Sequence, residues 1–419
     1  MTIPAALQHL TGDGWLLFAT RFIRLFAYGS LSVVLVFYLV GVGLSEQRIG
    51  TLLTLTLVGD TLVSLYLTTR ADRLGRPRVL VVGALLMAAA GVVFASTGSF
   101  WLLIVAGTIG VISPSGNEVG PFLSVEQAAL STVVTDHART EVFAWYTLAG
   151  SVATAVGSLA AGTATGWLQG STRLAPVSSY RTIVIAYAVL GGILAALFAR
   201  LSPAAESPTR GIRQRERSAF ANVSGLDRSR DVVLKLSALF TLDAFAGGFV
   251  IQSFAAYWFY LRFGVNPGTL GAIFFWANIL AGISALLASK LAERFGLIRT
   301  MVATHLPSNI LLILVPLMPT LPLAIFVLLV RFSISQMDVP TRQSYLMAVV
   351  SPEERSAAAG ITGVARTIGA SVSPLFVGAF FARPSLINLP FLIAGSLKIV
   401  YDLLLYRAFV RVRPPEELS

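Results

Sequence analysis

Charged side chains occur inside the long apolar runs of this chain. Six are basic and six are acidic: Arg21, Arg24, Arg331, Arg342, Arg366 and Lys398, with Asp60, Glu118, Glu126, Asp243, Asp338 and Asp402. At the centre of a membrane-spanning helix each charge costs roughly 3 kcal/mol on insertion scales. Facing lipid unpaired, they would cost on the order of 30 kcal/mol, well above the roughly 5–15 kcal/mol that stabilises a folded protein. We therefore expect most of them to face one another or water, where they can bind charged solutes or protons.

The composition places these charges in a membrane protein. The 419 residues are 55% hydrophobic and 12% charged, with a mean hydropathy of +0.78, whereas soluble domains carry roughly 25% charged residues. The longest polar stretch is 201–230, which leaves no room for a soluble enzyme domain. The net charge of +11 comes from residues in short gaps between apolar runs, so we predict no nucleic-acid partner.

Apolar runs long enough to cross the bilayer predict an all-α polytopic fold, because backbone polar groups in lipid must bond within a helix. The expected spans are 15–44, 48–69, 79–97, 101–134, 140–166, 181–200, 232–261, 268–289, 298–316, 321–349, 357–381 and 386–408. The segment 113–121 is rich in Gly and Pro and interrupts the fourth span. It indicates either a broken helix that exposes backbone to a solute or a simple kink.

Lysine and arginine are distributed unequally between alternate gaps. One set holds 20 of the 31 basic residues, and the other set holds five: Arg48, Arg173, Arg181, Arg262 and Arg383. The positive-inside rule then puts both termini and the basic linker in the cytoplasm, in a multi-pass protein of a cytoplasmic or inner membrane. The N-terminus has no basic region typical of a cleavable signal peptide.

The chain repeats itself. ADRLGRPR at 71–78 reappears as AERFGLIR at 292–299, and VVTDHARTEVF at 133–143 aligns with VVSPEERSAAA at 349–359. We predict an N-terminal six-helix bundle over 1–200, a cytoplasmic linker over 201–231 and a C-terminal six-helix bundle over 232–419. Such duplicated bundles are typical of transporters that bind solutes between the halves.

The loop from Asp72 to Arg78 resembles the G-x-L-A-D-R-x-G-R-K loop of the major facilitator superfamily, with Thr68 and Arg70 in place of the leading Gly and the Leu. The resemblance implies two pseudo-symmetric six-helix bundles around a central cavity, with transport by alternating access. It also implies that both copies of the loop stabilise the closed cytoplasmic side, through Asp72, Arg73, Gly75, Arg76, Glu293, Arg294 and Gly296.

A second motif resembles one in the fifth helix of the family's drug/proton antiporters. It reads Ala153-x-x-x-Gly157-Ser158-x-x-Ala161-Gly162, and a counterpart runs from Gly369 to Gly378 in the eleventh helix. These small residues are also those that let two helices pack closely. The antiporters' fourth-helix arginine is missing, because no basic residue lies between Ala106 and Phe122.

Helical spacing places several charged and aromatic residues on common faces. Arg331, Ser335, Asp338, Arg342 and Tyr345 share one face of the tenth span, and Arg21, Arg24, Tyr28, Leu35 and Tyr38 share one face of the first. The resemblance implies that the first, fourth, seventh and tenth helices line the cavity. The predicted solute-binding residues are Arg24, Tyr28, Glu118, Glu126, Asp243, Tyr257, Asp338, Arg342 and Tyr345.

Depth along the helices predicts specific partners. At 1.5 Å per residue, Arg24, Glu126, Asp243 and Arg342 lie roughly 12–15 Å from the cytoplasmic ends. We expect an Arg24–Glu126 pair and an Asp243–Arg342 pair, either as structural salt bridges or as part of a solute or proton site. In this superfamily the second and eleventh helices meet across the halves, so an Asp60–Arg366 bridge is expected to latch the cavity.

Other signals are weaker. Lys398 and Asp402 are four residues apart and predict a local ion pair on the last span. His9, His137 and His305 have no metal-ligand spacing, so we expect no metal, and no cofactor is predicted. The phosphate-binding motif GxxxxGK[ST] is absent, so ATP is not expected to drive transport directly.

Together these features predict a non-enzymatic secondary transporter, a monomer in the bilayer, that couples a small molecule to protons. Two directions stay open: export of an amphipathic compound in exchange for protons, and uptake or facilitated movement of a polar metabolite. A non-transporting membrane receptor or scaffold is a third hypothesis.

Overall fold

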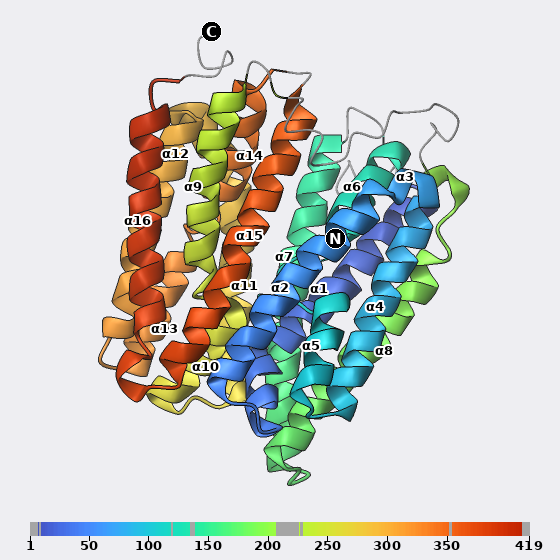
Figure 1. The fold of residues 1–419 in the computed structure, drawn as a ribbon, viewed down its shortest axis with the longest axis vertical. Helices are drawn as coiled ribbons and strands as arrows, with labels where there is room; N and C mark the ends of the chain where they lie inside the picture. The colour runs from blue at the N-terminus through green and yellow to red at the C-terminus, as the bar shows by residue number, and fades with distance from the viewer. Residues whose placement is uncertain are drawn as a thin grey trace.

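The computed structural model describes residue 7 and residues 10–118, 120–134, 139–206, 226, 229–351 and 354–412. Within these ranges the regular structure is helical and contains no β-strand, which confirms the all-α prediction (Figure 1). The helices of the N-terminal half are α1 (Gly12–Gly41), α2 (Glu46–Thr69), α3 (Ala71–Leu74), α4 (Arg76–Ser96), α5 (Phe100–Ile109), α6 (Phe122–Val133), α7 (Arg139–Gly170) and α8 (Pro176–Phe198). Those of the C-terminal half are α9 (Arg230–Gly248), α10 (Gln252–Phe263), α11 (Pro267–Phe295), α12 (Leu297–Leu314), α13 (Leu321–Phe332), α14 (Asp338–Val349), α15 (Arg355–Phe381) and α16 (Leu389–Phe409).

These helices account for the predicted membrane spans. Ten helical stretches in the described residues are long and apolar enough to cross a membrane. Two shorter apolar helices, α5 and α13, occupy the outer parts of the predicted fourth and tenth spans, and α6 and α14 complete those spans. The fourth and tenth spans are therefore both broken helices.

Proline explains the breaks. In the fourth span the helix stops at Ile109 and resumes after Pro121, across the segment that the sequence singles out. The break in the tenth span was not predicted. Pro340 lies in the first turn of α14, where its missing N–H costs nothing, but its ring would clash with the carbonyl of Gln336 in a continuous helix. The predicted continuous face from Arg331 to Tyr345 is therefore wrong, because Arg331 belongs to α13.

The two halves form separate bundles, α1–α8 and α9–α16, which lie side by side in Figure 1. Their repeated loops adopt the same backbone conformation. Gly75 ends α3 with φ of 94°, and Gly296 ends α11 with φ of 83°. Residues with a Cβ rarely adopt such angles, so both positions require glycine.

Two helix crossings join the halves, and glycine lies at each. In the first, α7 packs on α11, and a Cβ on Gly162 would lie 2.6 Å from the carbonyl oxygen of Pro267 and 2.8 Å from the Cα of Gly271. In the second, α2 packs on α15, and a Cβ on Gly378 would lie 3.0 Å from the Cα of Gly50. The small-residue motifs of the fifth and eleventh helices thus bring backbone against backbone between the halves.

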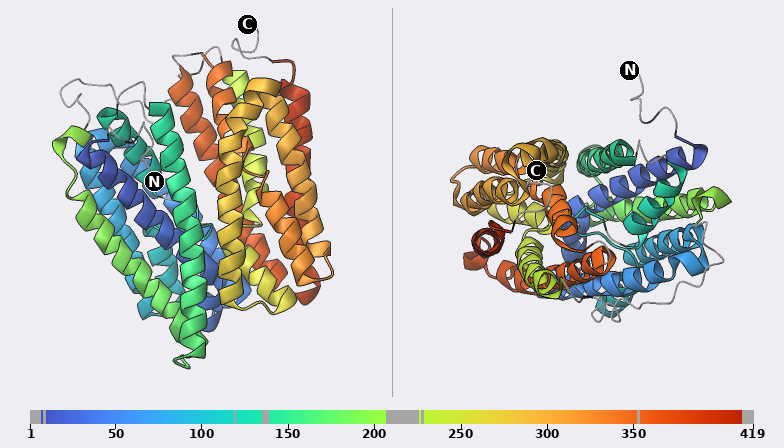
Figure 2. Two further views of the ribbon diagram at one scale, coloured as in Figure 1. Left: turned by 180° about the vertical axis from the view of Figure 1, so that it is seen from behind. Right: turned by 90° about the horizontal axis from the view of Figure 1, so that it is seen from above.

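Both crossings lie at the same end of the protein. We call it the outer end, where α1 is followed by α2 and α7 by α8, and call the opposite end, where α8 ends and α9 begins, the linker end. Figure 2 shows the ribbons of the two halves close together at the outer end and diverging toward the linker end. The halves are therefore joined by their outer parts.

We predict that Gly162→Val destabilises the protein through the outer crossing, because overpacking typically costs about 1–3 kcal/mol and here meets backbone atoms that cannot move aside. Gly166→Val, one turn further along α7, is the matched control, since a Cβ there meets nothing within 4 Å. Thermal unfolding in detergent, followed by tryptophan fluorescence, should show a lower melting temperature for Gly162→Val only. Equal melting of the two variants would contradict the proposed crossing.

Candidate functional site

A buried charge cluster lies inside the N-terminal half. Arg24 on α1 contacts the carboxylates of both Glu118 and Glu126, and its side chain and that of Glu126 are fully buried. Arg21 Nη1 lies 2.6 Å from Glu118 Oε1, and the Tyr146 hydroxyl donates to Glu126 Oε2 at 2.6 Å. We call these five residues the N-terminal cluster. It contains the predicted Arg24–Glu126 pair.

The local structure explains how these groups meet. Arg21 and Arg24 are three residues apart on α1 and therefore share a face. Glu126 lies in the second turn of α6, whereas Glu118 lies in the irregular segment that breaks the fourth span. Of the two carboxylates, only Glu118 reaches the surface, with 21% of its side chain exposed. The break in the fourth span thus leaves Glu118 partly exposed, while Glu126 is fully buried.

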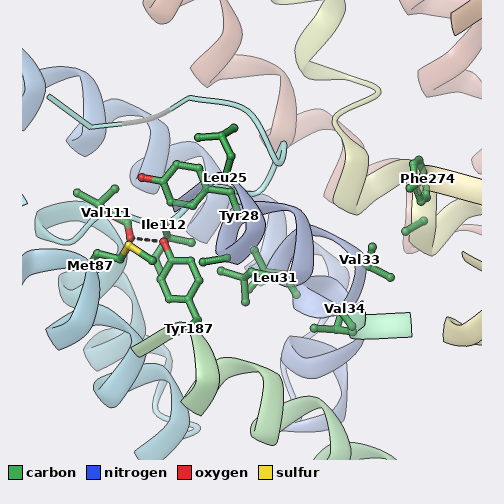
Figure 3. Packing of buried hydrophobic residues seen from close by; sticks show 14 of the residues in the cluster. Leu25, Tyr28, Leu31, Val33, Val34, Met87, Val111, Ile112, Tyr187 and Phe274 are labelled. Carbon is green, nitrogen blue, oxygen red and sulfur yellow. Dashed lines mark hydrogen bonds between the residues drawn. The ribbon is translucent and has the colours of Figure 1, made fainter. Parts of the chain in front are cut away.

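Tyr28 lies one turn from Arg24 but inside the packed N-terminal half. Its ring stacks on Tyr187 of α8 with centroids 6.2 Å apart, and the Tyr187 hydroxyl donates to the Val111 carbonyl at 2.8 Å (Figure 3). Tyr28 is fully buried in this conformation. Its predicted role in solute binding remains a prediction.

A second cluster lies in the C-terminal half and is centred on Asp243 of α9. The Oδ2 atom of Asp243 lies 3.0 Å from Arg342 Nη1 and 3.6 Å from Arg366 Nη1, and its Oδ1 atom lies 2.5 Å from Lys398 Nζ. Arg342 also pairs with Asp338 at 3.0 Å. The predicted Asp243–Arg342 pair is therefore present, within a larger group of charges.

The C-terminal cluster extends to α12 and α16. His305 Nε2 lies 3.9 Å from Asp243 Oδ1, and His305 Nδ1 lies 2.8 Å from Asp402 Oδ1. Asn309 Nδ2 donates to Asp402 Oδ2 at 2.9 Å. The C-terminal cluster comprises Asp243, His305, Asp338, Arg342, Arg366, Lys398 and Asp402.

The predicted local pair between Lys398 and Asp402 is wrong. Both residues lie on α16, but Lys398 contacts Asp243 and Asp402 contacts His305. Each finds a partner on another helix because both side chains point into the bundle, where less than 9% of either residue is exposed. The last span therefore contributes to the cluster, which the spacing of its own charges did not reveal.

The predicted Asp60–Arg366 latch is also wrong for this conformation. Asp60 Oδ1 accepts a hydrogen bond from the Gly120 amide at 2.6 Å, within the N-terminal half. Arg366 pairs with Asp243 in the C-terminal half, and 33% of its side chain is exposed. Depth alone placed the two residues at one level, but the break in the fourth span offers Asp60 a free backbone amide nearby.

Hydrogen bonds between the halves lie instead near the outer end. The Ser253 amide and hydroxyl donate to the Pro114 carbonyl at 3.2 and 2.5 Å. Gln252 Nε2 donates to the hydroxyl oxygens of Ser32 and Ser158 at 2.8 and 3.0 Å. The seventh span is also broken, between the end of α9 at Gly248 and the start of α10 at Gln252, and this break docks on the break in the fourth span. We call Ser32, Pro114, Ser158, Gln252 and Ser253 the outer latch.

Two predicted solute-binding tyrosines lie away from the clusters. The Tyr257 hydroxyl donates to Glu46 Oε1 at 3.1 Å across the halves, beside the outer latch. The Tyr345 hydroxyl donates to the Val412 carbonyl at 3.1 Å, and its ring packs edge-on against Phe409 of α16. In this conformation Tyr257 serves closure of the outer end and Tyr345 serves packing of the C-terminal half.

The repeated loops lie at the linker end. Arg76 Nη1 donates to the Ala128 carbonyl at 3.0 Å, which ties the loop to α6. Arg73, Glu293 and Arg294 are exposed, and the side chain of Asp72 lies outside the described residues. The predicted role of these residues in closing the linker end stays a prediction, since the halves diverge there.

Metal binding finds no support in the described part of the chain, where no three His, Asp or Glu side chains are grouped to hold an ion. His305 is nevertheless part of the site, and this role was not predicted because metal-ligand spacing says nothing about a lone histidine that pairs with carboxylates. A useful signal was available, since histidine, like the charged residues, is rare within membrane-spanning helices and almost always faces the bundle interior there. His9 and His137 lie outside the described residues.

Comparison with known proteins agrees with this architecture. The sequence model of the Major Facilitator Superfamily matches residues 17–330 and 238–419. An uncharacterized membrane protein of Saccharomyces cerevisiae is 31% identical over 421 residues, covering 95% of this chain and 94% of the yeast protein.

Solved structures show the same fold at low identity. A variant of the nucleoside transporter NupG has a TM-score of 0.77 at 14% identity, covering 95% of this chain and 100% of that one. A bacterial homolog of the human lysosomal transporter Spinster has a TM-score of 0.75 at 15% identity, covering 96% and 97%. A D-xylose–proton symporter has a TM-score of 0.71 at 14% identity, covering 97% and 99%.

We predict that Arg24→Met destabilises the protein more than Arg21→Met does. Removing one partner of a buried ion pair costs about 3–5 kcal/mol, and Arg24 neutralises two carboxylates whereas Arg21 contacts one. Expression level and thermal unfolding of the two purified variants provide the measurement. A variant at Arg24 as stable as the one at Arg21 would mean that the cluster does not depend on that guanidinium.

A second prediction concerns the outer latch. The chain has no cysteine, so Ser32→Cys with Gln252→Cys creates a single pair between α1 and α10. A short bis-methanethiosulfonate reagent should join these cysteines, and a protease site inserted between residues 207 and 225 makes the joining visible on a denaturing gel. We expect the joined halves to migrate together and transport to stop until a reductant is added. Full transport by the cross-linked protein would show that transport does not require the outer latch to open.

Proposed function

Because the chain belongs to the Major Facilitator Superfamily, it is a transporter rather than an enzyme, and we propose that it exports a small amphipathic compound in exchange for protons. The observation that supports this most directly is the pair of buried charge clusters, one in each half. Each has one partly exposed member, Glu118 in the N-terminal half and Arg366 in the C-terminal half.

The exposed fractions suggest how a solute is held. Glu118 offers a carboxylate to a cationic group, while Arg366 offers a partly exposed cationic side chain to an anionic group. A solute that displaces Arg21 from Glu118 exchanges one ion pair for another and leaves Glu126 with Arg24. Because only 6% of the Arg21 side chain is exposed, this displacement requires Arg21 to turn toward water or toward an anionic group of the solute.

The arrangement of the halves supports alternating access. The outer end is held by glycine crossings and the outer latch, and the ribbons diverge toward the linker end. With the basic linker in the cytoplasm, as the positive-inside rule predicts, this conformation receives solute from inside the cell. Export then requires the latch to open and the repeated loops around Gly75 and Gly296 to close.

The resemblance of the small-residue motifs to those of the family's antiporters is the reason for proposing exchange with protons, and their glycines Gly162 and Gly378 also pack the two halves together. Several buried carboxylates supply candidate proton carriers.

Uptake of a polar metabolite is the second candidate. It is favoured by the architecture shared with a nucleoside transporter and a D-xylose–proton symporter. A receptor or scaffold role is the third hypothesis, and it requires that the buried charges can be neutralised without functional loss.

Transport by purified protein in liposomes decides among these candidates. We expect a pH gradient to drive accumulation of ethidium, an amphipathic cation, and Glu118→Gln to abolish it in protein that thermal unfolding shows to be folded at the assay temperature. Glu141→Gln, an exposed residue of α7 that lies outside both clusters and the outer latch, is the control. Uptake of uridine or D-xylose in place of ethidium would support the second candidate, uptake of a polar metabolite. The third candidate, a receptor or scaffold, would be supported if no probe is transported and substitution of Glu118 has no functional effect.

A further inference from the structure

Asp402 is a buried carboxylate that lacks a fixed positive partner. It is fully buried on α16, and within the described part of the chain its two oxygens form hydrogen bonds only with His305 Nδ1 at 2.8 Å and Asn309 Nδ2 at 2.9 Å. No Lys or Arg in the described ranges lies within 4.0 Å of it. An ionised carboxylate buried in this way is expensive unless a proton compensates it, on its own oxygen or on the imidazole.

The neighbouring cations are already engaged. Lys398, Arg342 and Arg366 all contact Asp243, and Arg342 also contacts Asp338. They therefore do not neutralise Asp402 directly. Imidazole exchanges a proton near neutral pH, whereas lysine and arginine stay charged there. The group beside Asp402 that can gain or lose charge during transport is thus His305.

The two ring nitrogens of His305 face different carboxylates. With Nδ1–H donating to Asp402, the opposite nitrogen Nε2 lies 3.9 Å from Asp243 Oδ1. A neutral ring would point the Nε2 lone pair at that carboxylate, which is unfavourable. A protonated ring points an N–H at it, which is favourable and competes with Lys398 Nζ for the same oxygen, now 2.5 Å away.

We propose that the His305–Asp402 pair holds one exchangeable proton and that this proton sets the charge balance around Asp243. Loading takes one proton from water onto Nε2 of the neutral imidazole, and unloading returns it to water on the other side of the membrane. With the proton bound, His305 shares Asp243 with the cations. With the proton absent, Lys398, Arg342 and Arg366 hold Asp243 alone.

This site lies behind the predicted solute-binding face. His305 and Asn309 belong to α12 and Asp402 to α16, and they reach the central helix α9 through Asp243. The charged, titratable and polar groups that surround the imidazole are Asp243 on α9, Arg342 and Asp338 on α14, Arg366 on α15, Lys398, Tyr401 and Asp402 on α16, and Asn309 on α12 itself. A proton site separate from the solute-binding carboxylate Glu118 allows both to be occupied in sequence.

The inference rests on the proposed proton coupling, and a spectroscopic experiment tests it without a solute. His9→Gln with His137→Gln leaves His305 as the one histidine of three. In lipid nanodiscs, the ¹⁵N NMR signal of its ring should change from the cationic to the neutral form as the pH is raised. Asp402→Asn should reduce the cationic fraction, because it removes the carboxylate that stabilises it. A ring with one charge state throughout, or an unaltered titration in Asp402→Asn, would overturn the proposal.

A transport experiment then tests coupling. In liposomes that contain a pH-sensitive dye, His305→Gln should lose proton movement with ethidium, down to the level of protein-free liposomes, while ethidium exchange between the two sides persists. Ser308→Ala is the matched control, because this buried hydroxyl on the same helix makes no hydrogen bond. Wild-type proton movement in His305→Gln would refute the assignment, and Asp402→Asn serves as the second variant if His305→Gln does not fold.

The two proposals fail differently. If wild-type protein moves no ethidium under a pH gradient, the proposed export function is wrong for this probe, and the NMR titration still decides whether the pair holds a proton. If wild-type transport is proton-driven and remains so in both variants, the function stands and the assignment of the proton site is refuted.

Discussion

Ionised side chains cannot remain in hydrocarbon without partners, and this constraint organises the whole structure. Arg24, Glu126, Asp243 and Arg342 are each less than 10% exposed, and each has an oppositely charged partner on another helix. Because these partners come from helices far apart in sequence, pairing them fixes how the helices of each half pack. The same pairing confines the charges to the interior of the halves, leaving apolar residues such as Trp101, Phe326 and others on the outside.

A second constraint shapes the contact between the halves. In lipid, helices cannot associate through the hydrophobic effect as they do in water, so close packing and hydrogen bonds must join them. Glycine supplies the close packing at both crossings. Backbone groups freed at helix breaks supply hydrogen bonds, as when the Pro114 carbonyl accepts from Ser253. The features that interrupt regular helices in this chain are therefore also the features that join its two halves.

Much of this architecture could be predicted from sequence, because it depends on local and additive properties. Apolar length predicted the spans, and depth along each helix predicted the Arg24–Glu126 and Asp243–Arg342 pairs. Sequence failed where one group has several possible partners. Lys398 has Asp402 one turn away but contacts Asp243, and Asp60 finds a backbone amide rather than Arg366. Such choices depend on the rotation of each helix and on where it breaks, and neither follows from spacing alone.

The broken fourth span has a mechanical consequence. Its irregular segment holds the latch at Pro114 and, four residues on, the carboxylate Glu118 that contacts Arg24. An extended chain covers about 3.5 Å per residue, so these points are separated by at most about 14 Å of backbone. When the outer end opens and Pro114 moves with Ser253, this short segment displaces Glu118 once it is fully extended. The ion pairs of Glu118 with Arg21 and Arg24 would thereby change when the opposite half moves, without direct contact between the two charge clusters.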